Sequence, residues 1–68
     1  MAEAIAILGA GAWGTALAVM LARSGHHVAL CARRRDLADR IASARQNSEY
    51  LPQVAIPAEV EITDAWNL

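Results

Sequence analysis

The chain has 68 residues, a formal net charge of −1 and a single cysteine. This charge balance predicts no broad electrostatic attraction to nucleic acid or to an anionic membrane. Cys31 alone excludes an internal disulfide and offers no cluster of metal ligands. No basic segment precedes the apolar beginning, and glycines interrupt the longest apolar stretch. We therefore expect no signal peptide and no transmembrane span. The expected compartment is a reducing cytoplasm.

The composition is that of a protein core, although the chain is short. Hydrophobic residues make up 56% of it and charged residues 19%, against typical values of about 45–50% and about 25%. A chain of this length buries only about 60% of its unfolded surface. We therefore expect residues 1–68 to be the N-terminal part of a longer protein, with a further helix beginning near its end and Trp66 packed in the core.

The first predicted element is a strand over residues 4–8, because a continuously apolar segment is typical of a parallel strand covered on both faces. The sequence Gly-Ala-Gly-Ala-Trp-Gly follows at residues 9–14. A helix is predicted from residue 12 or 13 to residue 24, and Gly25 supplies a residue that commonly ends a helix. The spacing G-x-G-x-x-G between a strand and a helix indicates a turn that binds a dinucleotide pyrophosphate.

Each glycine of this turn has a different expected role. Gly9 allows the sharp turn, Gly11 lets the backbone approach a pyrophosphate, and Gly14 lets the helix pack closely on the strand. The N–H groups at the start of the helix then face the phosphates. Trp13 leaves two alternatives open, because its ring either covers one side of the cofactor or packs on the domain's own surface. Thr15 either donates its hydroxyl to a phosphate or bonds back to the helix.

The remaining elements extend the same pattern. A strand over residues 28–31 completes a βαβ unit. Asp36 is the expected N-cap of a helix that continues to about residue 45, with apolar residues at helical spacing. Residues 46–52 are loop-like, and residues 60–62 form a short third strand. The sequence therefore predicts an α/β fold: the N-terminal βαβαβ part of a Rossmann-type doubly wound parallel sheet, incomplete in this chain.

A basic segment after the second strand bears on the choice of cofactor. Proteins specific for NAD usually place Asp or Glu about 20 residues after the glycine motif, where it bonds the ribose 2′-hydroxyl. Here the segment is Arg33-Arg34-Arg35, and guanidinium groups bind a phosphate bidentately. We therefore predict that the cofactor is NADP or NAD with NADPH favoured, and that Arg33 and Arg34 contact the 2′-phosphate. A solvated basic loop is the alternative.

Four segments together resemble a known family. Residues 7–18, Ile-Leu-Gly-Ala-Gly-Ala-Trp-Gly-Thr-Ala-Leu-Ala, are similar to the opening of the bacterial NAD(P)-dependent glycerol-3-phosphate dehydrogenases. Gly-His-His-Val at residues 25–28, the Arg33-Arg34 pair and Asn-Ser-Glu-Tyr-Leu-Pro at residues 47–52 extend the resemblance over nearly the whole chain. The resemblance implies reversible reduction of dihydroxyacetone phosphate to sn-glycerol 3-phosphate, which feeds glycerophospholipid synthesis.

The resemblance also implies site residues and domain organisation. The positions that line the NADPH site in that family match Ala12, Trp13, Arg33, Arg34 and Tyr50. Residues 1–68 would then be a partial NAD(P)-binding domain. The rest of the cofactor domain, the catalytic lysine and a helical substrate domain would lie beyond Leu68. No catalytic residue and no metal ligand is therefore expected within this chain.

Two other interpretations stay open. Another dehydrogenase of the 6-phosphogluconate or hydroxyisobutyrate group would share the Gly-His-x-Val turn. A non-catalytic nucleotide-binding module of this length would leave apolar strands exposed. In the leading interpretation the partners are small molecules, dihydroxyacetone phosphate and glycerol 3-phosphate, with no nucleic acid and no membrane. A homodimer is compatible with the sequence, and the 68-residue piece alone is expected to fold poorly and to be inactive.

Overall fold

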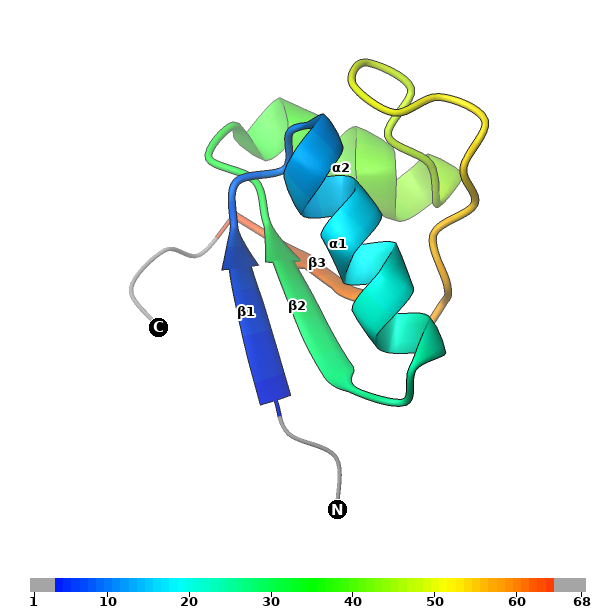
Figure 1. Cartoon of the computed structure of the whole chain (residues 1–68). Helices are drawn as coiled ribbons and strands as arrows, with labels where there is room; N and C mark the ends of the chain where they lie inside the picture. The colour runs from blue at the N-terminus through cyan, green and yellow to red at the C-terminus, as the bar shows by residue number, and fades with distance from the viewer. Residues whose placement is uncertain (1–3, 65–68) are drawn as a thin grey trace.

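A computed structural model describes residues 4–64 as a sheet with two helices (Figure 1). In chain order the elements are β1 (Ala4–Leu8), α1 (Ala12–Arg23), β2 (His27–Cys31), α2 (Arg35–Ala44) and β3 (Glu61–Thr63). The strands form one parallel sheet in the order β1-β2-β3. This arrangement confirms the predicted βαβαβ part of a Rossmann-type fold. Trp66 and the helix expected around it lie outside the described residues.

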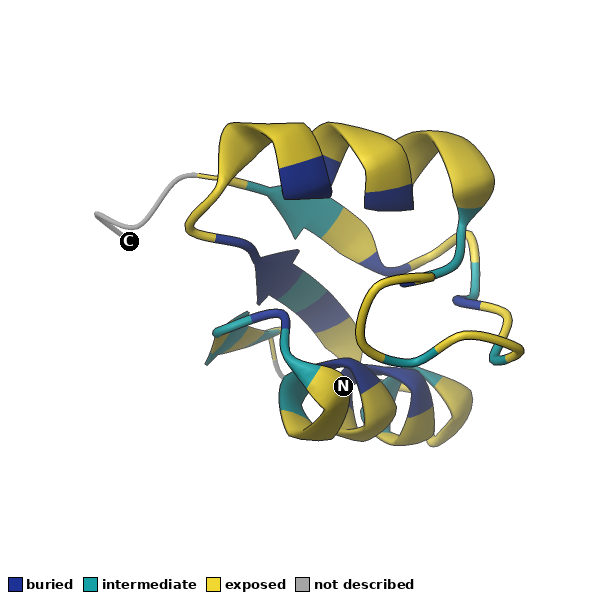
Figure 2. Cartoon of the chain, turned by 90° about the horizontal axis from the view of Figure 1, so that it is seen from above, coloured by how far each residue is buried: buried dark blue, intermediate teal, exposed yellow. Residues whose placement is uncertain are grey.

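The strand register aligns apolar side chains in a row across the sheet. Ile7 of β1 pairs with Leu30 of β2, and Leu30 pairs with Ile62 of β3. Leu30 is fully buried in a cluster that also contains Val19 of α1 and Ile41 of α2. The buried residues of both helices turn toward the sheet, and their outer sides are exposed (Figure 2). The core therefore lies between the helices and one face of the sheet.

The other face of the sheet is open in the described part of the chain. Exposed and half-buried residues alternate along β1, and Leu8 at its end is 56% exposed. One face is therefore open within residues 4–64, and its covering by a longer protein stays a prediction. The physical reason is the topology. Successive right-handed crossovers in one direction along a sheet bring their helices to the same side.

The start of α2 differs from the prediction. The helix begins at Arg35, and the side chain of its N-cap residue, Arg34, makes no capping hydrogen bond. Asp36 lies inside the first turn and not at the N-cap, and its carboxylate accepts hydrogen bonds from the Arg34 guanidinium. The helix ends at Ala44, and Arg45 adopts a left-handed conformation with φ 53°. β2 begins one residue earlier and β3 one residue later than predicted.

A long connection runs from α2 back to β3 and passes beside α1 (Figure 1). The Arg45 guanidinium donates to the carbonyls of Pro57 and Val60, the second at 2.8 Å. The N–H of Ile56 in turn donates to the carbonyl of Arg45 at 2.9 Å. Arg45 thereby fixes the end of the connection at the point where β3 begins. Within residues 4–64 neither helix is long and apolar enough to cross a membrane.

Candidate dinucleotide-binding site

The turn between β1 and α1 depends on two glycines. Gly9 has φ +120°, a conformation that other residues rarely adopt. Its N–H donates to the carbonyl of Cys31 at 2.9 Å, so that the turn continues the strand ladder. A Cβ at Gly14 would lie 1.9 Å from the Gly9 carbonyl oxygen and 3.4 Å from a methyl of Ile7. The sharp turn predicted for Gly9 and the close packing predicted for Gly14 are both confirmed.

The N-terminus of α1 opens to the surface. Gly11 is its N-cap and carries no side chain that could cap the helix, and the first turn holds no acidic residue. Because they begin the helix, Ala12 and Trp13 have no acceptor within it for their N–H groups. A Cβ on Gly11 would meet nothing within 4 Å. Free N–H donors at the positive end of a helix dipole, with open space in front, are suited to binding phosphate.

The structure excludes one of the two alternatives for Trp13 and one of the two for Thr15. The side chain of Trp13 is 90% exposed, so it does not pack on the surface formed by residues 4–64. Its covering of a cofactor stays a prediction. Thr15 is fully buried, and its hydroxyl oxygen accepts a hydrogen bond from the Asn47 amide at 2.8 Å. A contact between Thr15 and a phosphate is therefore wrong, because the side chain does not reach the surface.

Asn47 joins the loop after α2 to the glycine turn. Its fully buried Nδ2 donates to the carbonyl of Ala10 and to Oγ1 of Thr15, both at 2.8 Å. Its Oδ1 accepts from the N–H of Tyr50 at 3.4 Å, and its own carbonyl accepts from Leu51 at 2.7 Å. In the sequence, Asn47 stands out only as part of the segment at residues 47–52. Nothing in one sequence indicates that its partners would be residues far earlier in the chain.

A cleft of about 350 Å³ lies at the carboxyl ends of β1 and β2. Ligands bind at this end of the strands in open α/β sheets. It is lined by Gly9, Ala10, Gly11, Arg33, Arg34, Leu37 and Tyr50. Five of the predicted site residues therefore line one cleft. The other predicted residues, Ala12, Trp13 and Gly14, form the first turn of α1 directly after it.

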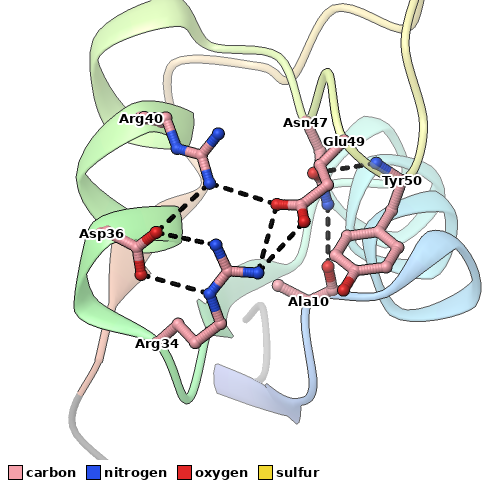
Figure 3. A network of polar contacts seen from close by, with 7 residues as sticks. All are labelled: Ala10, Arg34, Asp36, Arg40, Asn47, Glu49 and Tyr50. Atoms are coloured by element: carbon pink, nitrogen blue, oxygen red, sulfur yellow. Dashed lines mark hydrogen bonds and ion pairs between the residues drawn. The ribbon is translucent and has the colours of Figure 1, made fainter.

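Two arginines and two carboxylates form a network beside the cleft (Figure 3). Arg34 lies between Asp36 and Glu49: its Nε and Nη2 donate to Asp36 at 3.2 and 2.7 Å, and its Nη1 donates to Glu49 at 3.1 and 3.3 Å. Nη2 of Arg40 donates to Asp36 at 3.3 Å and to Glu49 at 3.1 Å. The contact between Glu49 and Arg40 could not be predicted from the sequence, because it depends on how the loop folds back toward α2.

The network shifts the pKa of Arg34 and of Asp36. The hydrogen bonds from Arg34 hold the pKa of Asp36 at about 2, below its ordinary 3.8. Hydrogen bonds to Asp36 and then to Glu49 raise the pKa of Arg34 above its usual range. Elsewhere, burial and secondarily the charge of Glu61 raise the pKa of the Cys31 thiol. Cys31 is fully buried, where a free cysteine packs as a small hydrophobic residue.

Comparisons with known proteins agree with this geometry. A sequence model of the family described as the NAD-dependent glycerol-3-phosphate dehydrogenase N-terminus matches residues 4–67. A glycerol-3-phosphate dehydrogenase of Deinococcus radiodurans, named for NAD(P)+, is 57% identical over 61 residues, or 90% of this chain and 19% of that protein. A second, from Mycobacterium tuberculosis H37Rv, is 48% identical over 63 residues, or 93% of this chain and 19% of that protein.

A solved structure gives the same result. The crystal structure of glycerol-3-phosphate dehydrogenase from Coxiella burnetii matches with a TM-score of 0.83 and 43% identity, over 88% of this chain and 18% of that one. The chain thus spans less than a fifth of the length of these relatives, at most 19%. The match covers the glycine turn, the arginines and the Tyr50 loop together. The chain belongs to the NAD-dependent glycerol-3-phosphate dehydrogenase family, whose N-terminal region it matches.

Proposed function

We propose that this chain forms part of the NAD(P)-binding domain of a glycerol-3-phosphate dehydrogenase. The whole protein would reduce dihydroxyacetone phosphate to sn-glycerol 3-phosphate with NAD(P)H, for glycerophospholipid synthesis. One observation carries the proposal. The uncapped N-terminus of α1 opens beside a cleft shared by the glycine turn, Arg33, Arg34 and Tyr50. The cofactor supplies the hydride, and the protein supplies binding and orientation.

The residues present fit the adenosine and pyrophosphate half of such a cofactor. The cleft volume of about 350 Å³ falls in the usual range for ligand pockets, about 300–1,000 Å³. In this proposal the N–H groups of Ala12 and Trp13 donate to the pyrophosphate, and the absence of a Cβ at Gly11 lets it come close. The exposed ring of Trp13 covers one side, and Tyr50 closes the other end of the cleft.

The proposal extends to the cofactor's 2′-position, the partners and the compartment. Arg33 and Arg34 line the cleft, and guanidinium groups favour a 2′-phosphate. We therefore propose a preference for NADPH over NADH. The partners would be dihydroxyacetone phosphate and glycerol 3-phosphate, with the catalytic lysine and the substrate domain beyond Leu68. A reducing cytoplasm suits the free Cys31, and a homodimer is compatible with the proposal.

Assay of the full-length protein tests the activity directly. We expect oxidation of both reduced cofactors with dihydroxyacetone phosphate as acceptor, and a lower KM for NADPH than for NADH. The same assay with 6-phosphogluconate or hydroxyisobutyrate and oxidised cofactor serves as the control for other dehydrogenases. Turnover with either of these, and none with dihydroxyacetone phosphate, would contradict the proposed substrate.

Substitution of Arg33 tests the cofactor preference. Arg33→Asp places a negative charge where the 2′-phosphate is proposed to bind, so we expect the KM for NADPH to rise while that for NADH changes little. Loss of a hydrogen bond to a charged group corresponds to about a 10- to 100-fold change in the ratio of the KM for NADPH to the KM for NADH. Arg23→Asp on the far end of α1 makes the same charge change away from the cleft and is the matched control. An unchanged ratio in Arg33→Asp would refute the assignment.

A further inference from the structure

The two carboxylates that bond Arg34 hold it in different ways. Asp36 lies in the first turn of α2 and accepts from two nitrogens of the guanidinium, Nε and Nη2, at 3.2 and 2.7 Å. Glu49 lies in the loop after α2 and accepts from Nη1 at 3.1 and 3.3 Å. Asp36 therefore fixes the orientation of Arg34 through two nitrogens from a helix, whereas Glu49 bonds a single nitrogen from a loop.

Glu49 also accepts from a second guanidinium. Nη2 of Arg40 donates to its Oε2 at 3.1 Å, so the carboxylate stands where two arginine side chains converge (Figure 3). Converging guanidinium groups are a typical binding arrangement for phosphate. A phosphate monoester carries a charge of about −1.5 to −2 at neutral pH, against −1 for a carboxylate. The position of the Glu49 carboxylate is thus one that a phosphate would favour more strongly.

The network is open enough for such an exchange. The side chain of Glu49 is 35% exposed, and that of Arg34 is 47% exposed. Arg34 lines the cleft together with Tyr50, the residue that follows Glu49. Exposed ion pairs contribute little to stability, so breaking the contacts of Glu49 costs the fold little.

We propose that Glu49 is a specificity-determining residue, because its carboxylate competes with the 2′-phosphate of NADPH for the guanidinium groups of Arg34 and Arg40. This inference rests on the proposed function of the cleft. A ligand without the 2′-phosphate does not compete for these guanidinium groups, so Glu49 keeps its hydrogen bonds from Arg34 and Arg40. Glu49 therefore decreases the difference in affinity between NADPH and NADH that the arginines create. Asp36 meanwhile holds the Arg34 guanidinium in place beside the cleft.

Direct binding to the full-length protein tests the competition. The probes are adenosine 2′,5′-bisphosphate and adenosine 5′-monophosphate, which differ only in the 2′-phosphate, and the readout is Kd by calorimetry. Glu49→Gln removes the charge and keeps the shape. Since each exposed ion pair shifts an equilibrium by about 1.4- to 5-fold and Glu49 makes two, we expect bisphosphate binding about 2- to 25-fold tighter. Binding of the monophosphate should change less than about twofold.

Glu59→Gln is the matched control, because it removes the same charge from an exposed position in the connection before β3, near His27 and away from Arg34. It should leave both Kd values unchanged. Bisphosphate binding by Glu49→Gln that is unchanged or weaker would overturn the inference, and so would equal tightening by both variants. If the unaltered protein binds neither probe and neither reduced cofactor, the proposed function itself fails and the inference falls with it.

Discussion

Gly11 and Gly14 lie three positions apart in one turn, yet the structure gives them opposite surroundings. A Cβ at Gly14 would meet the Gly9 carbonyl oxygen at 1.9 Å, whereas a Cβ at Gly11 would point into open space. Gly11 also has φ −78° and ψ −171°, which an alanine adopts without strain. A methyl group at position 14 should therefore disturb the fold. A methyl group at position 11 should disturb only the approach of a ligand.

Gly14→Ala and Gly11→Ala form a matched pair in the full-length protein. We expect Gly14→Ala to lower the free energy of unfolding by about 1–3 kcal/mol, because α1 has to move off β1. Gly11→Ala should stay within about 0.5 kcal/mol of the unaltered protein, yet bind NADPH at least about tenfold more weakly. Denaturant titration and calorimetry measure the two effects. Stability loss in Gly11→Ala, or normal stability in Gly14→Ala, would contradict these roles.

The residues of the glycine turn could be predicted from the sequence, and the residues that support it could not. Gly9, Gly11 and Gly14 carry a backbone requirement that shows as spacing between two local elements. Asn47 and Glu49 act through partners on other elements, Ala10 and Thr15 for one and Arg34 and Arg40 for the other. Such contacts depend on the path of the loop, and polar loop residues have no distinguishing pattern.

At the scale of elements, the start of α2 shows how an ion pair replaces a cap. Asp36 was expected to cap the helix, since an acidic residue before an apolar periodic segment is a common N-terminal signal. Its carboxylate instead bonds the guanidinium of Arg34, the residue that stands at the N-cap and makes no capping hydrogen bond with its own side chain. The strands and helices themselves could be predicted to within a residue or two, because local periodicity and turn residues determine them. The competition between a cap and an ion pair is decided by side-chain geometry.

The lowered pKa of Asp36 predicts a pH dependence of stability. Because the folded protein holds this pKa at about 2, below the ordinary 3.8, Asp36 contributes stability above pH 3.8 that is lost as the pH falls toward 2. Asp36→Asn should therefore be less stable than the unaltered protein at pH 5, and the difference should shrink toward pH 2. Urea titrations across this range measure it.

The control is the same substitution in an Arg34→Gln background. There the partner that lowers the pKa is missing, so Asp36→Asn should have a smaller effect at pH 5. A difference between Asp36→Asn and the unaltered protein that does not vary with pH would contradict the assigned ion pair. So would an equal effect of Asp36→Asn in both backgrounds.

At the scale of the whole molecule, the open face of the sheet is the dominant feature of residues 4–64. The fold class could be predicted from the order of the elements. The number of layers around the sheet could not, because apolar strands have the same sequence pattern whether one face or both are covered. β1 also lies at one edge of the described sheet, where its outer backbone groups are available for pairing. In the Rossmann strand order that edge is the position of a further strand.

The open face predicts how the 68-residue chain behaves when expressed alone. We expect it to self-associate through this face, where Leu8 is 56% exposed. Leu8→Gln should shift the chain toward monomer in sedimentation velocity. Leu17→Gln, at a site on α1 that is 42% exposed, removes an equally large apolar side chain from the helical side and should have less effect. A monomeric unaltered chain, or equal effects of the two substitutions, would contradict this expectation.

The buried amide of Asn47 has a consequence for how this site can change over evolution or under laboratory selection. It ties the Tyr50 loop to the carbonyl of Ala10 from inside the protein, so a buried side chain holds the two sides of the cleft together. The charged groups that would distinguish one cofactor from another, Arg34 and Glu49, are partly exposed. We therefore expect substitutions at these exposed positions to change the choice of cofactor without disturbing the buried contacts of Asn47.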